Sequence, residues 1–124
     1  MEARGRHMLV EFMGCDAGRL ADLELVTEAM LRAAREAGAT ILTHRFHRFE
    51  GPEGGQGVSG AVIISESHLA IHTWPEHAYA AVDLFTCGEW VDPMRAHAVL
   101  REALGAQADD TRLLERGPAR VPAS

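Results

Sequence analysis

The chain has 124 residues, of which 47% are hydrophobic and 24% charged, with a formal net charge of −6 and a pI of about 5.6. This length fits one domain with a real core, so residues 1–124 are expected to form a single domain, and the acidic balance argues against a nucleic-acid partner. No apolar stretch reaches the roughly 18 residues of a membrane span, and the start MEARGRHMLVEF lacks a signal peptide's apolar region. A cytoplasmic protein with no membrane partner is expected.

Two cysteines occur, Cys15 and Cys87. In a reducing compartment both are expected to remain thiols, so a disulfide is the weaker interpretation. Cys15 lies in the predicted turn MGCDAG, where an ordinary small residue at a strand end accounts for it.

The first predicted elements are a strand and a long helix. Residues 7–13, HMLVEFM, alternate as a strand does, and Gly14 ends it. Asp16 is a candidate N-cap for a helix expected to run to about Ala37, where Gly38 terminates it. The helix should lie on a sheet through an apolar stripe of Leu23, Val26, Met30, Ala33 and Ala37.

Residues 40–49, TILTHRFHRF, predict a second strand. Both of its faces mix apolar and cationic groups, which is typical of a strand at a site or subunit interface and equally of a solvated edge strand. The following Glu50–Gln56 segment, EGPEGGQ, reads as a flexible connection, because its glycines lack the Lys-Ser/Thr pair and helix start of a phosphate-binding loop. One face of the strand is expected to carry Ile41, Thr43, Arg45, His47 and Phe49.

The second half of the chain predicts three strands, a helix and a short final strand. Polar residues 65–68 follow the apolar residues 62–64 without a spacer, so either a turn or a site lies there. Pro75 breaks the next run, and Asp92 with Pro93 opens the helix as N-cap and first residue. Strands are expected at residues 58–65, 68–73, 79–86 and 111–115, an apolar helix stripe at Ala96, Val99, Leu100 and Ala103, and a frayed tail at 117–124.

This order of elements favours an α+β fold, a two-layer sandwich of a largely antiparallel sheet with two helices on one face. The strands are rich in Val, Ile, Leu and Phe, so a sheet covered by helices on one face only still has an apolar face exposed to solvent. Dimerisation through that face is the simplest remedy, so a homodimer with sheets packed face to face is expected.

Three kinds of site are considered for the polar residues of the central segment: a metal site, a hydrolase site and a site of backbone cleavage. His68, His72 and His77 lie close in sequence, and the first two would share a strand face, but no CxxC or HExxH pattern supports them and no metal is expected. A hydrolase built on Ser67 and Cys87 lacks the G-x-S-x-G elbow and a base nearby in sequence.

The third chemistry is cleavage of the backbone by Ser67. Its hydroxyl can attack the carbonyl of Glu66 if the peptide is strained in a tight bend and a proton carrier assists. β-Elimination of the resulting ester and hydrolysis leave a pyruvoyl ketone, which forms a Schiff base with an amine and accepts electrons on decarboxylation. A thiol such as Cys87 is a reasonable acid for reprotonation. From spacing alone, a turn with polar residues explains the segment as well.

The segment ISESHLAIHTWPEHAYAAVDLFTCG closely resembles the prokaryotic S-adenosylmethionine decarboxylases, which are pyruvoyl enzymes that supply aminopropyl groups for spermidine synthesis. The segments GRHMLVEFMGCD, GATILTHRFHRF and GVSG resemble the same family, so the likeness covers residues 5 to about 105. The first segment, ISESHLAIHTWPEHAYAAVDLFTCG, is a long ungapped match, which is more specific than any short motif.

The resemblance implies cleavage between Glu66 and Ser67, giving a β chain of residues 1–66 and an α chain of 67–124 that begins with a pyruvoyl group made from Ser67. It assigns processing to Ser59 and His72, with His72 as proton carrier, and reprotonation to Cys87. It also places Phe49, Trp74 and Glu76 around a substrate adenine and sulfonium. Without the resemblance, the two aromatic residues read as core residues, Ser59 as a turn hydroxyl and Glu76 as a solvated charge.

The chain departs from the family in the Glu50–Gln56 segment, which is longer, glycine-rich and acidic where the family has a short connection with a proline. Related pyruvoyl enzymes act on arginine or ornithine, and Glu50 or Glu53 would suit the distal cation of such a substrate. We therefore expect an S-adenosylmethionine decarboxylase, with an arginine or ornithine decarboxylase as the alternative. A dimeric partner that neither processes nor catalyses is a further alternative.

Overall fold

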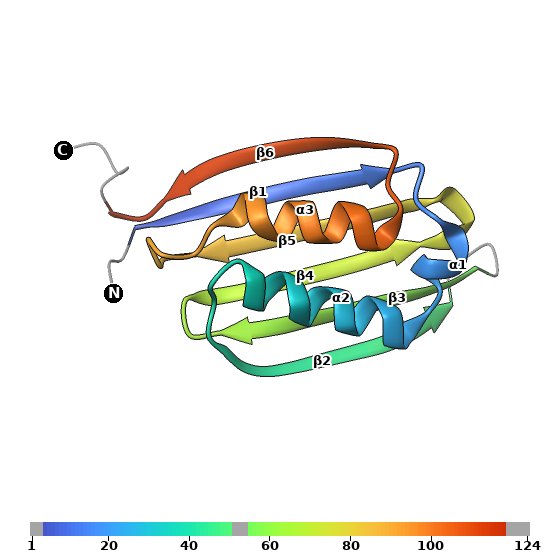
Figure 1. Cartoon of the computed structure of the whole chain (residues 1–124), viewed down its shortest axis with the longest axis horizontal. Helices are drawn as coiled ribbons and strands as arrows, with labels where there is room; N and C mark the ends of the chain where they lie inside the picture. The colour runs from blue at the N-terminus through green and yellow to red at the C-terminus, as the bar shows by residue number, and fades with distance from the viewer. Residues whose placement is uncertain (1–3, 51–54, 119–124) are drawn as a thin grey trace.

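The computed structural model describes residues 4–50 and 55–118, which form a six-stranded sheet with helices packed on one face (Figure 1). The predicted α+β class and the order of strands and helices are confirmed. The elements are β1 (Gly5–Met13), α1 (Ala17–Leu20), α2 (Leu23–Glu36), β2 (Ile41–Glu50), β3 (Gln56–Ile64), β4 (Ser67–Trp74), the 3-10 helix η1 (Pro75–His77), β5 (Tyr79–Thr86), α3 (Pro93–Leu104) and β6 (Ala108–Arg116).

The sheet has the order β2-β3-β4-β5-β1-β6, and every neighbouring pair is antiparallel. Strands β2 to β5 follow one another as a meander, since each pairs with the next along the chain. The N-terminal strand β1 is inserted between β5 and β6. The predicted antiparallel sheet is therefore confirmed, with β2 and β6 as its edges.

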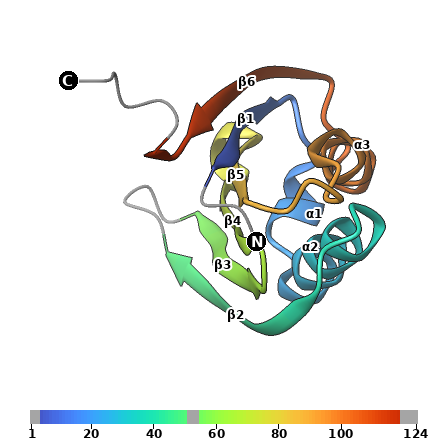
Figure 2. The same cartoon turned by 90° about the vertical axis from the view of Figure 1, so that its left-hand side faces the viewer.

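The core lies between the sheet and the helices, which all pack on the same side (Figure 2). Burial alternates along β5, as expected for a strand with one face toward a core. Each large side chain that is fully buried contributes about 1.5–3 kcal/mol of hydrophobic stabilisation. The largest of these are Phe12, Met8, Leu20, Met30, Leu69, Ile71, Leu100 and Leu104.

The opposite side of the sheet is not covered by any helix of the described chain (Figure 2). We call it the open face. It is mixed in character, because half-buried aromatic and aliphatic side chains alternate with ionisable ones. Its residues include His7, Leu9 and Glu11 of β1, Ser59, Ala61 and Ile63 of β3, His68, Ala70, His72 and Trp74 of β4, Tyr79, Ala81, Asp83 and Phe85 of β5, and Arg112 and Leu114 of β6.

The prediction of one helix from Asp16 to Ala37 is wrong, because the segment forms two helices. Asp16 caps α1, whose last turn ends at Ala21. The next residue, Asp22, returns to an extended conformation and its side chain accepts a hydrogen bond from the Leu25 amide, so it starts α2. The predicted end is confirmed, since Gly38 follows the helix with a φ of +90°.

Strand β2 also differs from the expectation that Ile41 and Thr43 share a face. A bulge between them pairs Ile41 with Ile64 and Thr43 with Ile63, although Ile64 is buried and Ile63 is 42% exposed. The extra residue therefore sends Ile41 toward the helices and Thr43 toward the open face. Most of β2 is exposed, which matches the edge-strand interpretation.

The remaining strands match their predicted ranges to within a few residues, and β6 is longer than expected at both ends. In the predicted flexible connection Glu50–Gln56, Glu50 ends β2 and Gln56 begins β3. Residues 51–54 of that connection, including Glu53, and residues 119–124 of the predicted tail lie outside the described residues.

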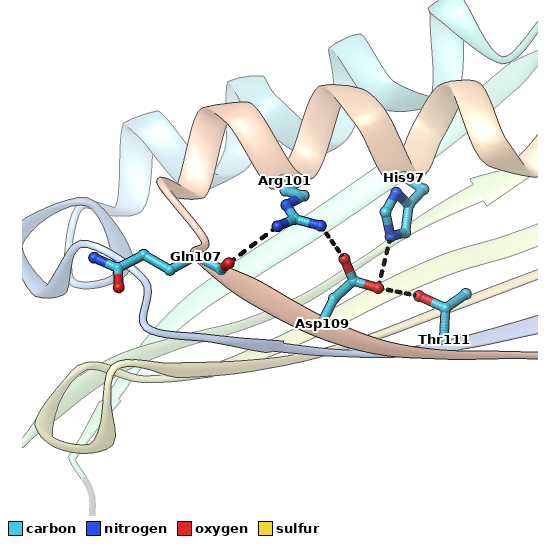
Figure 3. A network of polar contacts seen from close by, with 5 residues as sticks. All are labelled: His97, Arg101, Gln107, Asp109 and Thr111. Carbon is cyan, nitrogen blue, oxygen red and sulfur yellow. Dashed lines mark hydrogen bonds and ion pairs between the residues drawn. The ribbon is translucent and has the colours of Figure 1, made fainter.

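The edge strand β6 is attached to α3 through Asp109 (Figure 3). Its carboxylate lies 2.6 Å from Arg101 Nη1 and 3.2 Å from Nε2 of the buried His97, and it accepts a 2.6 Å hydrogen bond from the Thr111 hydroxyl. Arg101 also donates to the Gln107 carbonyl at 3.0 Å. The Thr111 bond lowers the pKa of Asp109 most, and although burial opposes it, His97 and Arg101 add to the lowering.

We expect Asp109→Asn to lower the free energy of unfolding by about 1–2 kcal/mol, because it removes the charge that these partners stabilise. The pKa of Asp109 is lowered by folding, so this contribution is full above the ordinary aspartate pKa of about 3.9 and is lost as the pH falls through the lower folded value. Urea unfolding of both proteins at several pH values measures the difference. Asp110→Asn is the matched control on the opposite face of β6, and an equal effect of both substitutions would contradict the expectation.

Candidate active site

The bend between β3 and β4 contains a strained residue. Ser65 and Glu66 form the turn, as expected, and Ser67 is the first residue of β4 with a φ of +146°. Residues other than glycine rarely adopt such a conformation, which costs on the order of 1–3 kcal/mol. The surrounding structure therefore stores strain in the Glu66–Ser67 peptide.

The thiol of Cys87 reaches this peptide from the end of β5. Its Sγ lies 3.8 Å from Ser67 Oγ, and its backbone N–H donates a 2.8 Å hydrogen bond to the Glu66 carbonyl. Thr86, just before it, pairs with Ser67 in the β4–β5 ladder and fixes the register. The structure thus brings together Glu66, Ser67 and Cys87, three of the predicted site residues.

The side chain of Glu66 is buried, with only 1% of its surface exposed. Its Oε1 accepts a 3.0 Å hydrogen bond from the Thr40 amide and its Oε2 a 3.0 Å hydrogen bond from the Trp90 indole. Burial raises the pKa of this carboxyl, but hydrogen bonds from Thr40, Trp90, the Glu66 amide itself and the Ser65 hydroxyl outweigh it, so the pKa is lowered. The carboxylate is therefore held in its ionised form.

Sequence reasoning treated Glu66 only as the residue before the cleaved bond and did not find Thr40 or Trp90. Both partners are more than 20 residues away in sequence, so only the tertiary structure reveals them. The available signal was the carboxylate itself, because an acidic residue beside a buried strand needs hydrogen-bond donors.

A cavity of about 220 Å³ opens beside Cys87 at the same end of the sheet. Cationic and anionic side chains both border it. The lining residues are Arg4, Gly5, Arg6, Thr86, Cys87, Gly88, Glu89 and Glu115.

A second group of predicted residues lies at the other end of the sheet. Ser59 Oγ and His72 Nδ1 are 2.8 Å apart on adjacent strands of the open face. The His72 and Phe49 rings both lie against Trp74, with centroid distances of 6.2 and 6.3 Å. Ser59, His72, Trp74 and Phe49 therefore form one cluster.

Tyr79 belongs to this cluster and was missed by the sequence analysis, which assigned it only to a strand. Its ring stacks on Trp74 at 5.3 Å, and its hydroxyl donates to Glu11 at 2.8 Å. Burial and this carboxylate raise the pKa of Tyr79 to about 12. Glu76 also lies at this end, because its carboxylate is next to Gly55, where an added Cβ would collide with Oε1.

The two groups do not meet within one chain. Ser67 and His72 are both in β4, five residues apart, where they pair with Thr86 and Ala81 respectively. An extended strand places such residues about 17 Å apart. The predicted proton carrier therefore cannot reach the Ser67 peptide of its own chain.

The two cysteines and the histidines of β4 lie as expected. Both cysteines are free thiols, and burial raises the pKa of Cys15 to about 11. His68 and His72 share the open face, as expected from strand geometry.

Residues 4–50 and 55–118 hold no group of three or more His, Cys, Asp or Glu arranged to bind a metal, and no helix among them is long and apolar enough to cross a membrane.

Comparison with known proteins identifies the class first. The structure superposes with a TM-score of 0.84 on the crystal structure of the adenosylmethionine decarboxylase from Aquifex aeolicus, at 31% sequence identity over 100% of this chain and 99% of that one. The fold is thus that of a decarboxylase.

The family follows from the sequence comparisons. Residues 6–117 match the family model described as S-adenosylmethionine decarboxylase. The chain is 50% identical to the S-adenosylmethionine decarboxylase proenzyme of Acidithiobacillus ferrooxidans over 94% of its own length and 85% of the relative, and 52% identical to that of Thermotoga petrophila over 94% and 87%. The chain belongs to the S-adenosylmethionine decarboxylase family.

The strain at Ser67 can be tested with two variants that both lack the hydroxyl. We expect Ser67→Gly to be more stable than Ser67→Ala by about 1 kcal/mol, because only glycine adopts this φ without strain. At Ala70, in ordinary strand conformation on the same strand, Ala→Gly is expected to destabilise by about 0.5–1 kcal/mol. Urea unfolding of the intact chains measures both differences, and the same sign at both positions would contradict the strain.

Proposed function

We propose that this chain is a pyruvoyl-dependent S-adenosylmethionine decarboxylase that cleaves itself between Glu66 and Ser67. The observation that carries the proposal is the strained Ser67, with its hydroxyl beside the Cys87 thiol and the preceding carbonyl bound by the Cys87 amide. The proenzyme names of the relatives support a precursor that is processed.

The proposed cleavage begins as an acyl shift. Ser67 Oγ bonds to the Glu66 carbonyl carbon, the peptide C–N bond breaks, and the hydroxyl proton ends on the Ser67 nitrogen. The Cys87 N–H already donates to the oxygen that gains charge in this step. Loss of the Ser67 Cα proton then breaks the Cβ–Oγ bond and releases the Glu66 carboxylate. The elimination leaves dehydroalanine at the new N-terminus. Water hydrolyses it, the nitrogen leaves as ammonia, and a pyruvoyl group remains.

The residues around Ser67 fit this group. The position lies at a chain end once the bond is cut, next to a cavity bordered by charged side chains and within reach of a thiol. When present, the pyruvoyl group supplies an electrophilic ketone that forms a Schiff base with the substrate amine and takes up the electrons released on decarboxylation. Decarboxylation would leave a carbanion next to this position. The Cys87 thiol is placed to donate a proton to it.

The distance between Ser67 and His72 supports a homodimer built across the open face. If His72 carries the proton for cleavage, it has to come from a second copy, because its own Ser67 is about 17 Å away along β4. The open face exposes large apolar side chains such as Ile63 (42%) and Leu114 (48%), which a second sheet would cover. In this arrangement each site combines Ser67 and Cys87 of one copy with Ser59 and His72 of the other.

The aromatic cluster suits the proposed substrate. Phe49, Trp74 and the added Tyr79 offer ring faces for an adenine and for a sulfonium cation, and the Glu76 carboxylate adds a negative charge. The product would supply aminopropyl groups for spermidine synthesis. The arginine or ornithine alternative depended on the Glu50–Gln56 segment, most of which lies outside the described residues, and the named relatives favour S-adenosylmethionine.

Intact-mass spectrometry under denaturing conditions tests the self-cleavage. The wild-type protein is expected to give two chains, 1–66 and 67–124, with the second lighter by one ammonia than a chain that begins with serine. Ser67→Ala is expected to remain a single folded chain of about 13.5 kDa without decarboxylase activity. A single wild-type chain, or normal decarboxylation by Ser67→Ala, would refute the proposal.

Co-expression of two differently tagged variants tests the shared site. Ser67→Ala alone has no nucleophile, and His72→Ala alone has no proton carrier, so neither is expected to be cleaved at the wild-type rate. Together they should form mixed dimers in which the His72→Ala chain is cut with the help of the other copy's histidine. The double variant Ser67→Ala/His72→Ala serves as control partner. Equal cleavage with both partners would show that His72 does not act between copies.

A further inference from the structure

Glu66 connects three segments that are distant in sequence. Thr40, just before β2, donates its amide to the Glu66 carboxylate, while its carbonyl accepts a 2.9 Å hydrogen bond from the Ser65 amide. Trp90, in the loop after β5, donates from the other side. The turn before the scissile bond is therefore fixed to β2 and to the loop that carries Cys87.

The loop that carries Trp90 is itself anchored. Arg6 of β1 donates to the carbonyls of Gly88 and Val91, at 3.3 and 2.6 Å. Gly88 packs so closely that a Cβ there would lie 2.8 Å from Glu66 Cγ and 3.0 Å from Trp90 Cε2. The Trp90 indole is thereby kept against the carboxylate, although 59% of the residue is exposed.

These contacts act on the carbonyl side of the strained peptide, whereas the ladder pairing of Ser67 with Thr86 acts on its nitrogen side. A strained conformation persists only where its surroundings hold both ends. If the Glu66 side chain were released, the turn could rotate and the φ of Ser67 could relax toward ordinary values. The orientation of the hydroxyl relative to the Glu66 carbonyl, which this φ sets, would then no longer be fixed.

We propose that the Glu66 carboxylate is a positioning group for self-cleavage, held by the Thr40 amide and the Trp90 indole so that the Glu66–Ser67 peptide stays in its strained, reactive geometry. This rests on the proposed function, because it concerns the first step of that cleavage. The carboxylate forms no bond and takes no proton in the acyl shift. Its role is complete once the ester has formed.

The test follows cleavage of newly made full-length chain in a cell-free pulse-chase experiment. Trp90→Phe keeps an aromatic ring but removes the indole N–H, and it is expected to slow cleavage about tenfold, the value of one hydrogen bond to a charged group. Glu66→Gln keeps the shape but turns an amide NH₂ toward one of the two donors, and it is expected to slow cleavage at least as much. Glu102→Gln removes an exposed carboxylate from α3 and should cleave at the wild-type rate.

Hydroxylamine in the chase separates positioning from later steps, because it cleaves an ester as soon as one forms. Both variants should remain slow in hydroxylamine while their thermal unfolding midpoints stay near that of Glu102→Gln. Wild-type rates in either variant, or rates restored by hydroxylamine, would overturn the positioning role. If Glu66→Gln does not fold, Trp90→Phe decides the test, because Trp90 is largely exposed and its substitution should leave the fold intact. Absence of wild-type cleavage would instead overturn the proposed function.

Discussion

The buried Glu66 carboxylate is the constraint on which the geometry of the candidate site depends. An ionised group with 1% exposure is tolerated only if donors surround it, and here they come from the start of β2, from the turn itself and from the loop after β5. Meeting this requirement ties the outer β2 strand to the β5–α3 connection. The same contacts bring the Cys87 amide and thiol to the peptide that follows Glu66.

The second constraint is the pleat of the sheet. Because side chains alternate, the residues that build the core and those that form the open face come from the same strands. Strand β4 thus carries Leu69 and Ile71 toward the helices and His68 and His72 away from them. The length of this strand then separates Ser67 from His72. A site that needs both residues has to be assembled from two chains.

Much of this architecture could be predicted from the sequence because it depends on local patterns. Alternation and helical spacing gave nearly all element ranges, and the polar run after Val62–Ile64 gave the bend at Glu66. The misses have physical reasons. The break at Ala21 depends on a competition between two aspartate caps, and the bulge at Leu42 depends on pairing with β3. The donors to Glu66 and the stacking of Tyr79 arise only when distant segments meet.

The position of β1 has a consequence for a chain that is cut after Glu66. The fragment 1–66 contributes β1, β2 and β3, and the fragment 67–124 contributes β4, β5 and β6, yet β1 lies between β5 and β6. The two pieces interlock, since one strand of the first is hydrogen-bonded on both sides by strands of the second. Such fragments would stay together without a covalent link while the sheet is intact. After complete unfolding, however, they would have to find each other by diffusion, so recovery would depend on concentration. Only the uncut chain would be able to refold without meeting a second fragment.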